Sequence, residues 1–197
     1  MQSNARSSIA EMLLFARNFV LHPHMLGSVI PSSRYVVDQV LQPIDWERAQ
    51  VFVEYGPGVG TFTGEILGRM RADTRLVVIE TNRDFVRFLR RSFPDERLHV
   101  VHDSAACVRK VLQRLGLPAA QYIISGIPLG SMPDPVRAQI VDETRAALAP
   151  GGAFLVYQFT ARALPVLERT FSSVRRGFER RNLPPAQLFV CATGLAD

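Results

Sequence analysis

The chain has 197 residues, of which 47% are hydrophobic, which is enough for one domain with a full hydrophobic core. Its two cysteines exclude a disulfide-rich scaffold and are expected to be buried thiols in a reducing cytoplasm. No stretch approaches the ~20 apolar residues of a membrane-spanning helix. The formal net charge is +5, and all of the positive side chains except Lys110 are arginines. This charge predicts nucleic acid or an acidic membrane surface as a partner, although a general preference for arginine would give the same composition.

The first predicted element is a helix over residues 6–21. Its apolar residues recur at helical spacing, but the apolar face is wider than one core contact requires. Such a helix could lie in a membrane interface with Arg6 and Arg17 near the head groups, or it could pack over the rest of the fold. Because Glu11 and Arg17 interrupt the apolar stretch, we expect no secretory signal peptide.

The segment His22-Pro23-His24 ends this helix. No carboxylate or cysteine lies close to the two histidines in sequence, so we expect no metal site. Ser32 or Ser33 can cap a second helix that runs to about Leu41. A loop before the first strand can also fold over a bound ligand, which makes Ser28 and Ser33 candidate contacts.

A short apolar strand, Val51–Val53, ends at Glu54 and is followed by a glycine-rich turn and a helix over Thr61–Met70. Glycines let a backbone approach a ligand closely, and a helix N-terminus offers free N–H groups. This arrangement is typical of a site for a nucleotide-like ligand at the end of a sheet. The turn residues expected to contact the ligand are Gly56, Pro57, Gly58 and Gly60.

The turn departs from a dinucleotide fingerprint in two places. That fingerprint would need a glycine where Thr61 stands, and Pro57 removes an N–H group that a pyrophosphate would use. Glu54 adds an acid beside the turn. An acid there repels phosphate but suits a ligand with an ammonium or sulfonium group. For the glycines alone, an ordinary turn remains an alternative.

Two further strands end in acids. Leu76–Ile79 ends at Glu80, and Leu98–Val101 is followed by His102 and Asp103. An acid at the end of the second strand, roughly 20 residues past the glycines, is where a ribose diol receives its hydrogen bonds. Asp103 could accept from an adenine amino group. Three acids at one edge of a sheet are a more specific signal than the glycines.

The second half of the chain continues the alternation of helices and strands. A helix starts at Ala105 and ends before Gly116, and the hairpin turn near the C-terminus is short. Pro150-Gly151-Gly152 is expected to stop the long helix. The remaining predicted elements are strand 122–124, helix 134–148, strand 153–159, strand 174–181, turn 182–185 and strand 188–192.

From residue 51 to the C-terminus the chain resembles the class I S-adenosylmethionine-dependent methyltransferases. VEYGPGVG matches their first motif, VVIE their second and VHDSA their third. The resemblance implies a Rossmann-like α/β fold with a seven-stranded mixed sheet whose last strand is antiparallel. It also implies one domain, with residues 1–45 as a helical lid for membrane and substrate and residues 46–197 as the cofactor-binding core. The resemblance implies that Glu54, Gly56, Gly58, Glu80 and Asp103 hold the cofactor. The further expected cofactor contacts are Pro57, Gly60, Thr81, Ser104, Ala105 and Ser125, with Ser28 and Ser33 from the preceding loop.

Two resemblances compete for the methyl acceptor. VEYGPGVGTFT is similar to the rRNA adenine dimethyltransferases, which carry Asn-Leu-Pro-Tyr after the fourth strand. Here that place is Ser125-Gly126-Ile127-Pro128-Leu129, without the amide and without the ring that stacks on the base. Such stacking contributes ~1–3 kcal/mol, and their helical RNA-binding domain has no counterpart among the predicted elements. Base methylation is therefore the second hypothesis.

Over residues 15–192 the chain looks more like the bacterial phospholipid N-methyltransferases. The matching pieces are the first helix, HPHMLGSVIPSSR, VEYGPGVG, SGIPLGSMP and RRNLPPA. This resemblance implies methylation of the amine of phosphatidylethanolamine toward phosphatidylcholine. It implies a phospholipid substrate and an anionic membrane surface as partners, with no nucleic acid and no metal. The expected location is cytoplasmic, at the inner face of the cytoplasmic membrane.

Methyl transfer from a sulfonium is an in-line displacement, so positioning supplies most of what the protein contributes. The amine must first lose a proton, and His22, His24 and Tyr35 are the candidate acceptors. In this fold class the end of the fourth strand, at Gly126 and Ile127, faces the methyl group. These two residues, with His22 and Tyr157, form the predicted catalytic set.

The methylated products are bulky cations, which aromatic faces hold well. Tyr157 and Phe19 could supply such faces, although core packing would also explain an aromatic residue. Arg180 and Arg181 are expected to bind the phosphodiester, and Tyr35 completes the predicted substrate set. The arginine-rich segment 169–181 could contact an anionic membrane or could be a solvated edge strand.

Overall fold

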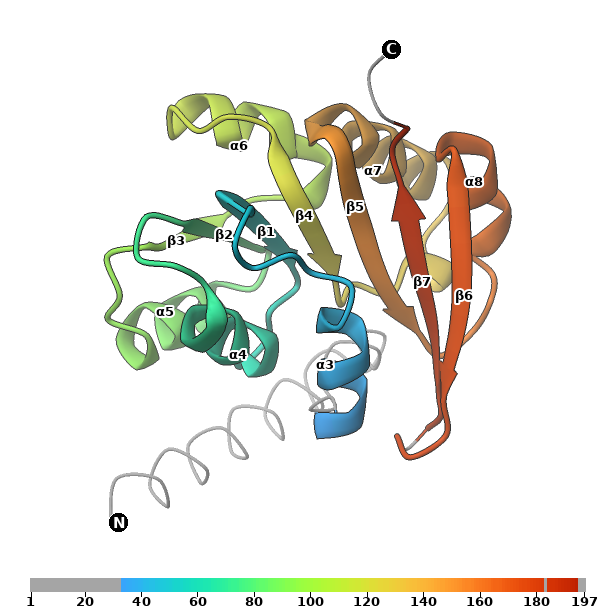
Figure 1. The fold of residues 1–197 in the computed structure, drawn as a ribbon, viewed down its shortest axis with the longest axis horizontal. Helices are drawn as coiled ribbons and strands as arrows, with labels where there is room; N and C mark the ends of the chain where they lie inside the picture. Colours follow the sequence, from blue (N-terminus) through green and yellow to red (C-terminus); the bar gives the residue numbers. More distant parts are fainter. Residues whose placement is uncertain (1–32, 183, 195–197) are drawn as a thin grey trace.

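The computed structural model describes residues 33–182 and 184–194, and in this part of the chain seven strands form one mixed sheet (Figure 1). The strand order is β3-β2-β1-β4-β5-β7-β6; β1 to β5 are parallel, and β7 is antiparallel to both of its neighbours. The predicted mixed sheet with an antiparallel last strand is confirmed. The strands are β1 Val51–Tyr55, β2 Arg75–Glu80, β3 Leu98–His102, β4 Ala120–Ser125, β5 Leu148–Gln158, β6 Ser173–Glu179 and β7 Ala186–Ala192.

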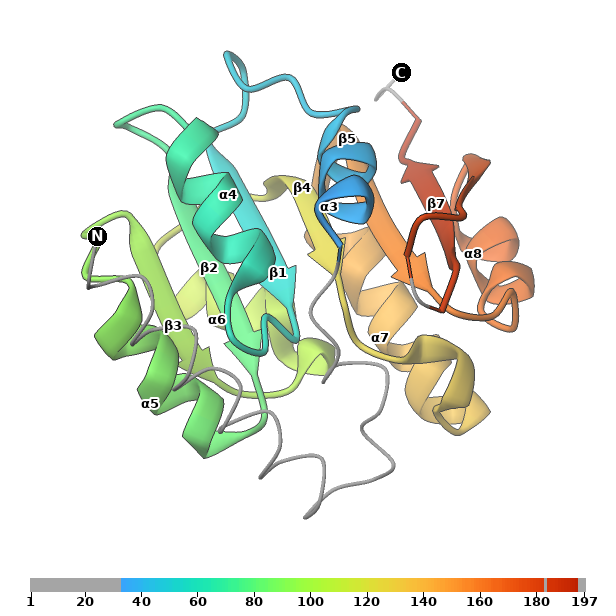
Figure 2. The same ribbon diagram turned by 90° about the horizontal axis from the view of Figure 1, so that it is seen from below.

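Helices cover both faces of the sheet (Figure 2). One core lies under α3 and α4, and the other lies under α6, α7 and α8. Strands buried on both faces are mostly apolar, and β1 is buried at every position, with Glu54 as its one acid. The helices are α3 Arg34–Leu41, α4 Thr61–Arg69, α5 Arg83–Ser92, α6 Val108–Arg114, α7 Asp134–Ala147 and α8 Leu164–Thr170, with 3₁₀ turns η2 Ala105–Cys107 and η3 Leu129–Ser131.

Helix α3 starts at the predicted cap. The Ser33 hydroxyl accepts from the Val36 N–H at 3.4 Å, and the Ser33 N–H donates to Asn182 Oδ1 at 3.0 Å. Its buried residues include Val36 and Leu41, which share a core with β1 and α4. The expected lid boundary at residue 45 thus falls after a helix that belongs to this core.

Several predicted boundaries were wrong because strand pairing continues past the local signals. β1 extends beyond Glu54 because Tyr55 still pairs with Ile79. β5 begins at Leu148, which pairs with Ala120 ahead of an irregularity in register. Pro150-Gly151-Gly152 therefore lies inside a strand, and α7 already ends at Ala147.

The other differences come from local hydrogen bonding. The helix predicted from Ala105 starts as the 3₁₀ turn η2, whose first turn is capped by Ser104. β6 ends at Glu179 rather than Arg181, because the Glu179 carboxylate accepts from the Arg181 N–H at 2.7 Å. The sequence analysis missed α8, whose signal is a proline in the first turn. No helix among the described residues is long and apolar enough to cross a bilayer.

Candidate active site

A cavity of about 170 Å³ opens at the carboxyl ends of the central strands. Seven of the predicted site residues line it together: Gly56, Glu80, Thr81, Asp103, Ser104, Ala105 and Ile127. Four apolar residues that the sequence analysis did not assign complete the wall: Ile79, Pro128, Met132 and Ile140. Acids marked the polar side of this cavity in the sequence, whereas most of its apolar side comes from the loop after β4 and from α7, which only the fold brings there.

The glycine turn after β1 needs its glycines for two reasons. Gly56, Gly58 and Gly60 all have positive φ angles, of 62°, 56° and 85°. A Cβ on Gly56 would also lie 2.6 Å from Ile127 Cγ2, and one on Gly60 would lie 2.5 Å from the Phe93 ring. The turn is closed by the Gly60 N–H, which donates to the Pro57 carbonyl at 2.8 Å.

Glu80 is only 4% exposed and ends β2 at the cavity. Its Oε1 accepts from the Asn82 N–H at 2.8 Å. Burial raises the pKa of Glu80, while hydrogen bonds from the backbone of Asn82, Gly58 and Thr81 act in the opposite direction. These donors hold the carboxylate in one orientation, which suits an acceptor for a ribose diol.

Asp103 follows β3 on the other side of the cavity. Its Oδ1 accepts from the Ser104 N–H at 2.8 Å, and its Oδ2 lies 3.8 Å from Arg114. The Ser104 hydroxyl accepts from the Ala106 N–H at 3.2 Å. Both side chains are therefore oriented by the start of η2, at the place expected for an adenine contact.

Glu54 lies under the glycine turn and is 2% exposed. It accepts from the Thr63 hydroxyl at 2.6 Å. Burial raises the pKa of Glu54 to about 8; Thr63 opposes this shift, and the nearby Glu80 carboxylate adds to it. A buried acid of this kind is suited to a cationic ligand, because the ligand's charge would offset the cost of ionising it.

Ser125 ends β4 with an exposed fraction of 0%, and its Oγ has no hydrogen-bond partner among the described residues. A buried hydroxyl without a partner is costly, so it is suited to a polar group of a bound ligand. With the oriented Glu80, the buried Glu54 and the close backbone approach at Gly56, it offers polar groups of the kind that would fit S-adenosylmethionine. That cofactor would supply the methyl group.

Tyr157 lies at the end of β5 beside the loop that follows β4. Its ring stacks on Phe62, with centroids 5.1 Å apart. A Cβ on Gly126 would lie 2.6 Å from the Tyr157 hydroxyl and 3.2 Å from the Gly56 carbonyl oxygen. The structure thus brings the predicted catalytic residues Tyr157, Gly126 and Ile127 to the same edge of the sheet, next to the glycine turn.

The sequence analysis missed Gln158, which is 6% exposed. Its Nε2 donates to the Ile127 carbonyl at 2.7 Å, and its Oε1 accepts from the Gly130 N–H at 3.1 Å. One side chain thereby holds both ends of the loop after β4. The sequence signal that could have identified Gln158 is a glutamine within a predicted apolar strand, directly after the predicted catalytic residue Tyr157.

Tyr35 and Arg181 contact each other away from the cofactor cavity. The Arg181 guanidinium lies 4.0 Å from the centroid of the Tyr35 ring and makes two 3.0 Å bonds to Glu179. Arg181 lowers the pKa of Glu179 and so favours the ion pair. Arg180 is exposed at the same hairpin. The predicted residues Phe19, His22, His24 and Ser28 lie outside the described residues.

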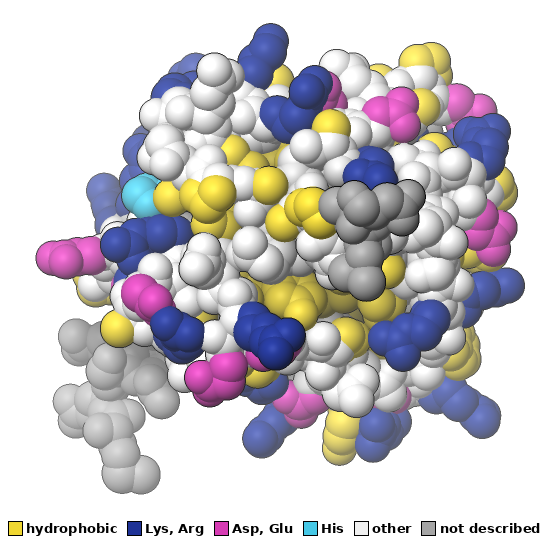
Figure 3. All heavy atoms as spheres, turned by 45° about the horizontal axis from the view of Figure 1, so that its top comes forward, with side chains coloured by type: hydrophobic (Ala, Val, Ile, Leu, Met, Phe, Trp, Pro, Cys, Tyr) yellow, Lys and Arg dark blue, Asp and Glu magenta, His cyan; other side chains and the backbone are white. Residues whose placement is uncertain are grey.

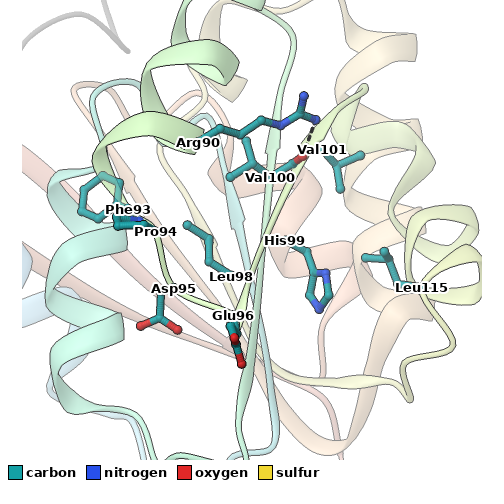
Figure 4. Close-up of a pocket in the computed structure, with 10 residues that line it drawn as sticks. All are labelled: Arg90, Phe93, Pro94, Asp95, Glu96, Leu98, His99, Val100, Val101 and Leu115. Atoms are coloured by element: carbon teal, nitrogen blue, oxygen red, sulfur yellow. Dashed lines mark hydrogen bonds between the residues drawn. The ribbon is translucent and has the colours of Figure 1, made fainter.

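A different hollow, of about 490 Å³, runs along the outer edge of β3 (Figure 4). It contains none of the predicted site residues. Arg90 reaches over it and donates to the Val100 carbonyl at 2.8 Å. This contact covers a backbone acceptor of an edge strand, which is a common way to protect such an edge.

The fold and this site define an S-adenosylmethionine-dependent methyltransferase: a 3-2-1-4-5-7-6 sheet with a glycine turn after β1 and an acid after each of β2 and β3. The chain is 33% identical over 189 residues to the ornithine lipid N-methyltransferase of Singulisphaera acidiphila, with 92% of this chain and 95% of that protein covered. The chain belongs to the family of S-adenosylmethionine-dependent N-methyltransferases that this relative represents.

Three other similarities cover less of the sequence or show the fold alone. The family model for ribosomal RNA adenine dimethylase matches residues 24–108. Ribosomal RNA small subunit methyltransferase A of Bordetella avium is 36% identical over 73 residues, which are 37% of this chain and 27% of that protein. The solved N-methyltransferase NodS of Bradyrhizobium japonicum, in complex with S-adenosyl-L-homocysteine, aligns with a TM-score of 0.64 at 15% identity, over 81% of this chain and 84% of that one.

Proposed function

We propose that this enzyme methylates the primary amine of a membrane lipid, and that phosphatidylethanolamine is the lipid, converted stepwise toward phosphatidylcholine. The observation that carries the proposal is the stacked pair of Tyr157 and Phe62 beside Gly126. An aromatic face at the end of the sheet suits an amine that becomes a more alkylated cation at each step. The lipid N-methyltransferase relative supports the same acceptor class.

Methyl transfer requires the protein mainly to position the amine of the lipid against the methyl group of the cofactor. S-adenosylmethionine, when bound, would supply the methyl group, and the amine nitrogen would accept it through its lone pair once its proton has passed to water or to a nearby base. Gly126 lets the Tyr157 hydroxyl and the Gly56 carbonyl lie close to the loop after β4, because a Cβ there would meet both of them. Gln158 holds the neighbouring loop in place. Tyr35, a candidate proton acceptor, has its ring against Arg181.

A phospholipid also requires a cationic contact and access from the membrane. Arg181 is held in place by Glu179 and Tyr35, at the same end of the sheet as Gln158, since Glu179 pairs with Ala186 and Gln158 pairs with Gln187. These positions support a role for Arg180 and Arg181 in binding the phosphodiester. The predicted interfacial helix lies outside the described residues, and we propose it as the membrane anchor of an enzyme at the inner face of the cytoplasmic membrane.

A second candidate substrate is an ornithine lipid, because the relative from Singulisphaera acidiphila carries that name. It shares the free amine but has no phosphodiester. Methylation of ribosomal RNA is a third hypothesis, supported by the match over residues 24–108. It is weaker because the loop after β4 carries neither an amide side chain nor a ring at the positions of Gly126 to Leu129.

Methyl transfer from radiolabelled S-adenosylmethionine separates these acceptors. Vesicles that contain phosphatidylethanolamine, vesicles that contain ornithine lipid, and unmethylated ribosomal RNA are offered in parallel, and the lipids are resolved by thin-layer chromatography. We expect label in phosphatidylethanolamine and its methylated forms. Label in ornithine lipid alone would show that ornithine lipid, and not phosphatidylethanolamine, is the substrate. Label in RNA alone would overturn the proposal of a lipid substrate.

A further inference from the structure

A groove of about 650 Å³ lies between α3 and the strands β6 and β7, separate from the cofactor cavity. We call it the α3–β6 groove and define it by Tyr35, Arg175, Gly177, Arg181, Leu188 and Val190. Its floor is apolar, because Leu188 and Val190 face α3 from β7. Figure 3 shows one face of the molecule, on which hydrophobic side chains lie in a hollow bordered by lysine and arginine side chains.

Gly177 leaves the groove open, because it has no side chain to fill the space over β6 and β7. It pairs with Leu188 across the two strands, so a side chain at either position is directed to the same face. Gly177 does not have a positive φ angle, and a Cβ there would lie 3.4 Å from Leu188 Cβ, which is an ordinary contact. Neither backbone conformation nor packing therefore requires glycine, although glycine weakens a strand. What glycine provides at position 177 is therefore open space above Leu188 in the groove.

Arginines border the apolar floor. Arg181 spans one end of the groove, from the hairpin to the Tyr35 ring on α3. Arg175 pairs with Val190, and among the described residues no carboxylate lies within ion-pair distance of Arg175. The acid of the groove, Asp38, is already 3.0 Å from Arg69. The groove thus combines a hydrocarbon-like floor with the positive charge of Arg175, whereas the charge of Arg181 is paired with Glu179.

We propose that the α3–β6 groove binds one acyl chain and the phosphate of a membrane phospholipid. The hydrocarbon would lie over Gly177, Leu188 and Val190, and the phosphate would pair with Arg175. A lipid held there would keep the enzyme at the bilayer while the cofactor cavity remains free. This proposal extends the proposed function, but a phospholipid without an amine would bind the groove equally well.

The test uses the full-length protein and dihexanoylphosphatidylglycerol, an anionic phospholipid with no amine to methylate, titrated below its micelle concentration. Glycerol 3-phosphate and inorganic phosphate are the probes without acyl chains. We expect wild type to bind the lipid at least tenfold more tightly than either chainless probe. Gly177→Leu should abolish this advantage by filling the floor, and Arg175→Gln should weaken the lipid and the chainless probes together.

Gly68→Leu is the matched control, because it adds the same side chain at an exposed glycine of α4 with nothing within 4 Å of its Cβ. Thermal melts of each variant check folding. Equal binding of the lipid by wild type and Gly177→Leu, or no advantage of the lipid over phosphate, would overturn the proposal. So would a wild type that is dimeric when Gly177→Leu is monomeric, since a second copy would then occupy the groove. Binding without methylation of any lipid would overturn only the proposed function.

Discussion

The Gln158 amide donates to the Ile127 carbonyl at 2.7 Å and so ties the end of β5 to the loop that follows β4. The same side chain accepts from the Gly130 N–H, 28 residues away in sequence. The Ile127 carbonyl also accepts from the Leu129 N–H at 2.8 Å, so it keeps a partner if Gln158 is lost, whereas among the described side chains it is Gln158 that accepts from the Gly130 N–H. Gln158 thus orients the loop that faces the predicted acceptor position.

We expect Gln158→Met to lower kcat about 100-fold, because displacement of a positioning loop by about 1 Å can cost that much. The free energy of unfolding should fall by ~1–3 kcal/mol, the cost of the unpaired Gly130 N–H. Gln158→Glu keeps an acceptor for Gly130 and should be less stable than wild type but more stable than Gln158→Met. Gln187→Met, at the paired position on β7, is the control. Unchanged kcat in Gln158→Met would rule out the positioning role.

Glu80→Ala should weaken binding of S-adenosyl-L-homocysteine about 10- to 100-fold, because hydrogen bonds to a charged acceptor contribute ~1.5–3 kcal/mol each. Isothermal calorimetry measures this directly. Glu65→Ala removes an exposed carboxylate of α4 and should leave the affinity unchanged. An unchanged affinity in Glu80→Ala would contradict the assignment of the ribose contact.

The affinity for S-adenosyl-L-homocysteine should rise as the pH is raised from 6 to 8. Below its raised pKa of about 8 Glu54 is neutral, and a ligand with an ammonium group must ionise it on binding. Binding then releases a proton, and the affinity gains up to about tenfold per pH unit in this range. Glu54→Gln should remove the dependence. If the wild-type affinity is constant over this range, Glu54 does not face the ammonium group.

The same carboxyl group makes the unliganded protein less stable as the pH rises. Its pKa is raised from 4.5 when unfolded to about 8 when folded, so the folded state binds more protons between these values. The contribution of Glu54 to the free energy of unfolding should therefore be largest below pH 4.5. It should fall by up to about 1.4 kcal/mol per pH unit as the pH is raised toward 8. Urea unfolding at pH 6 and pH 8 measures the slope, and Glu54→Gln should flatten it. A slope that persists in the variant must come from other groups.

Gly126→Ala should reduce kcat about 100-fold, because the new Cβ would lie 2.6 Å from the Tyr157 hydroxyl. Adding Tyr157→Phe removes that oxygen and leaves the next ring atom at 3.2 Å, so the double variant should recover part of the activity. Gly68→Ala controls for an added methyl group. Steady-state methylation assays compare the three. A double variant no better than Gly126→Ala would show that the contact with Tyr157 is not what limits the reaction.

The fold class and the polar side of the cofactor cavity could be predicted because their signals are local. Glu80 and Asp103 stand within a residue or two of strand ends, and parallel strands bring their carboxyl ends to one edge of a sheet. Boundaries were less predictable where pairing overrides local signals. Pro150-Gly151-Gly152 resembles a helix stop but lies within β5, because Leu148 already pairs with Ala120.

The sequence by itself determined the cofactor class, since the residues that define it lie close together in three short motifs. Only the tertiary structure decided the contacts between distant residues: the hold of Gln158 on Gly130, the place of Tyr157 beside Gly126, and the α3–β6 groove. The physical reason is that such contacts depend on strand register and on the packing of α3 against the sheet. Shifting β6 by one residue would turn Gly177 to the opposite face, and shifting β7 would turn Leu188, so either shift would disrupt the floor of the groove.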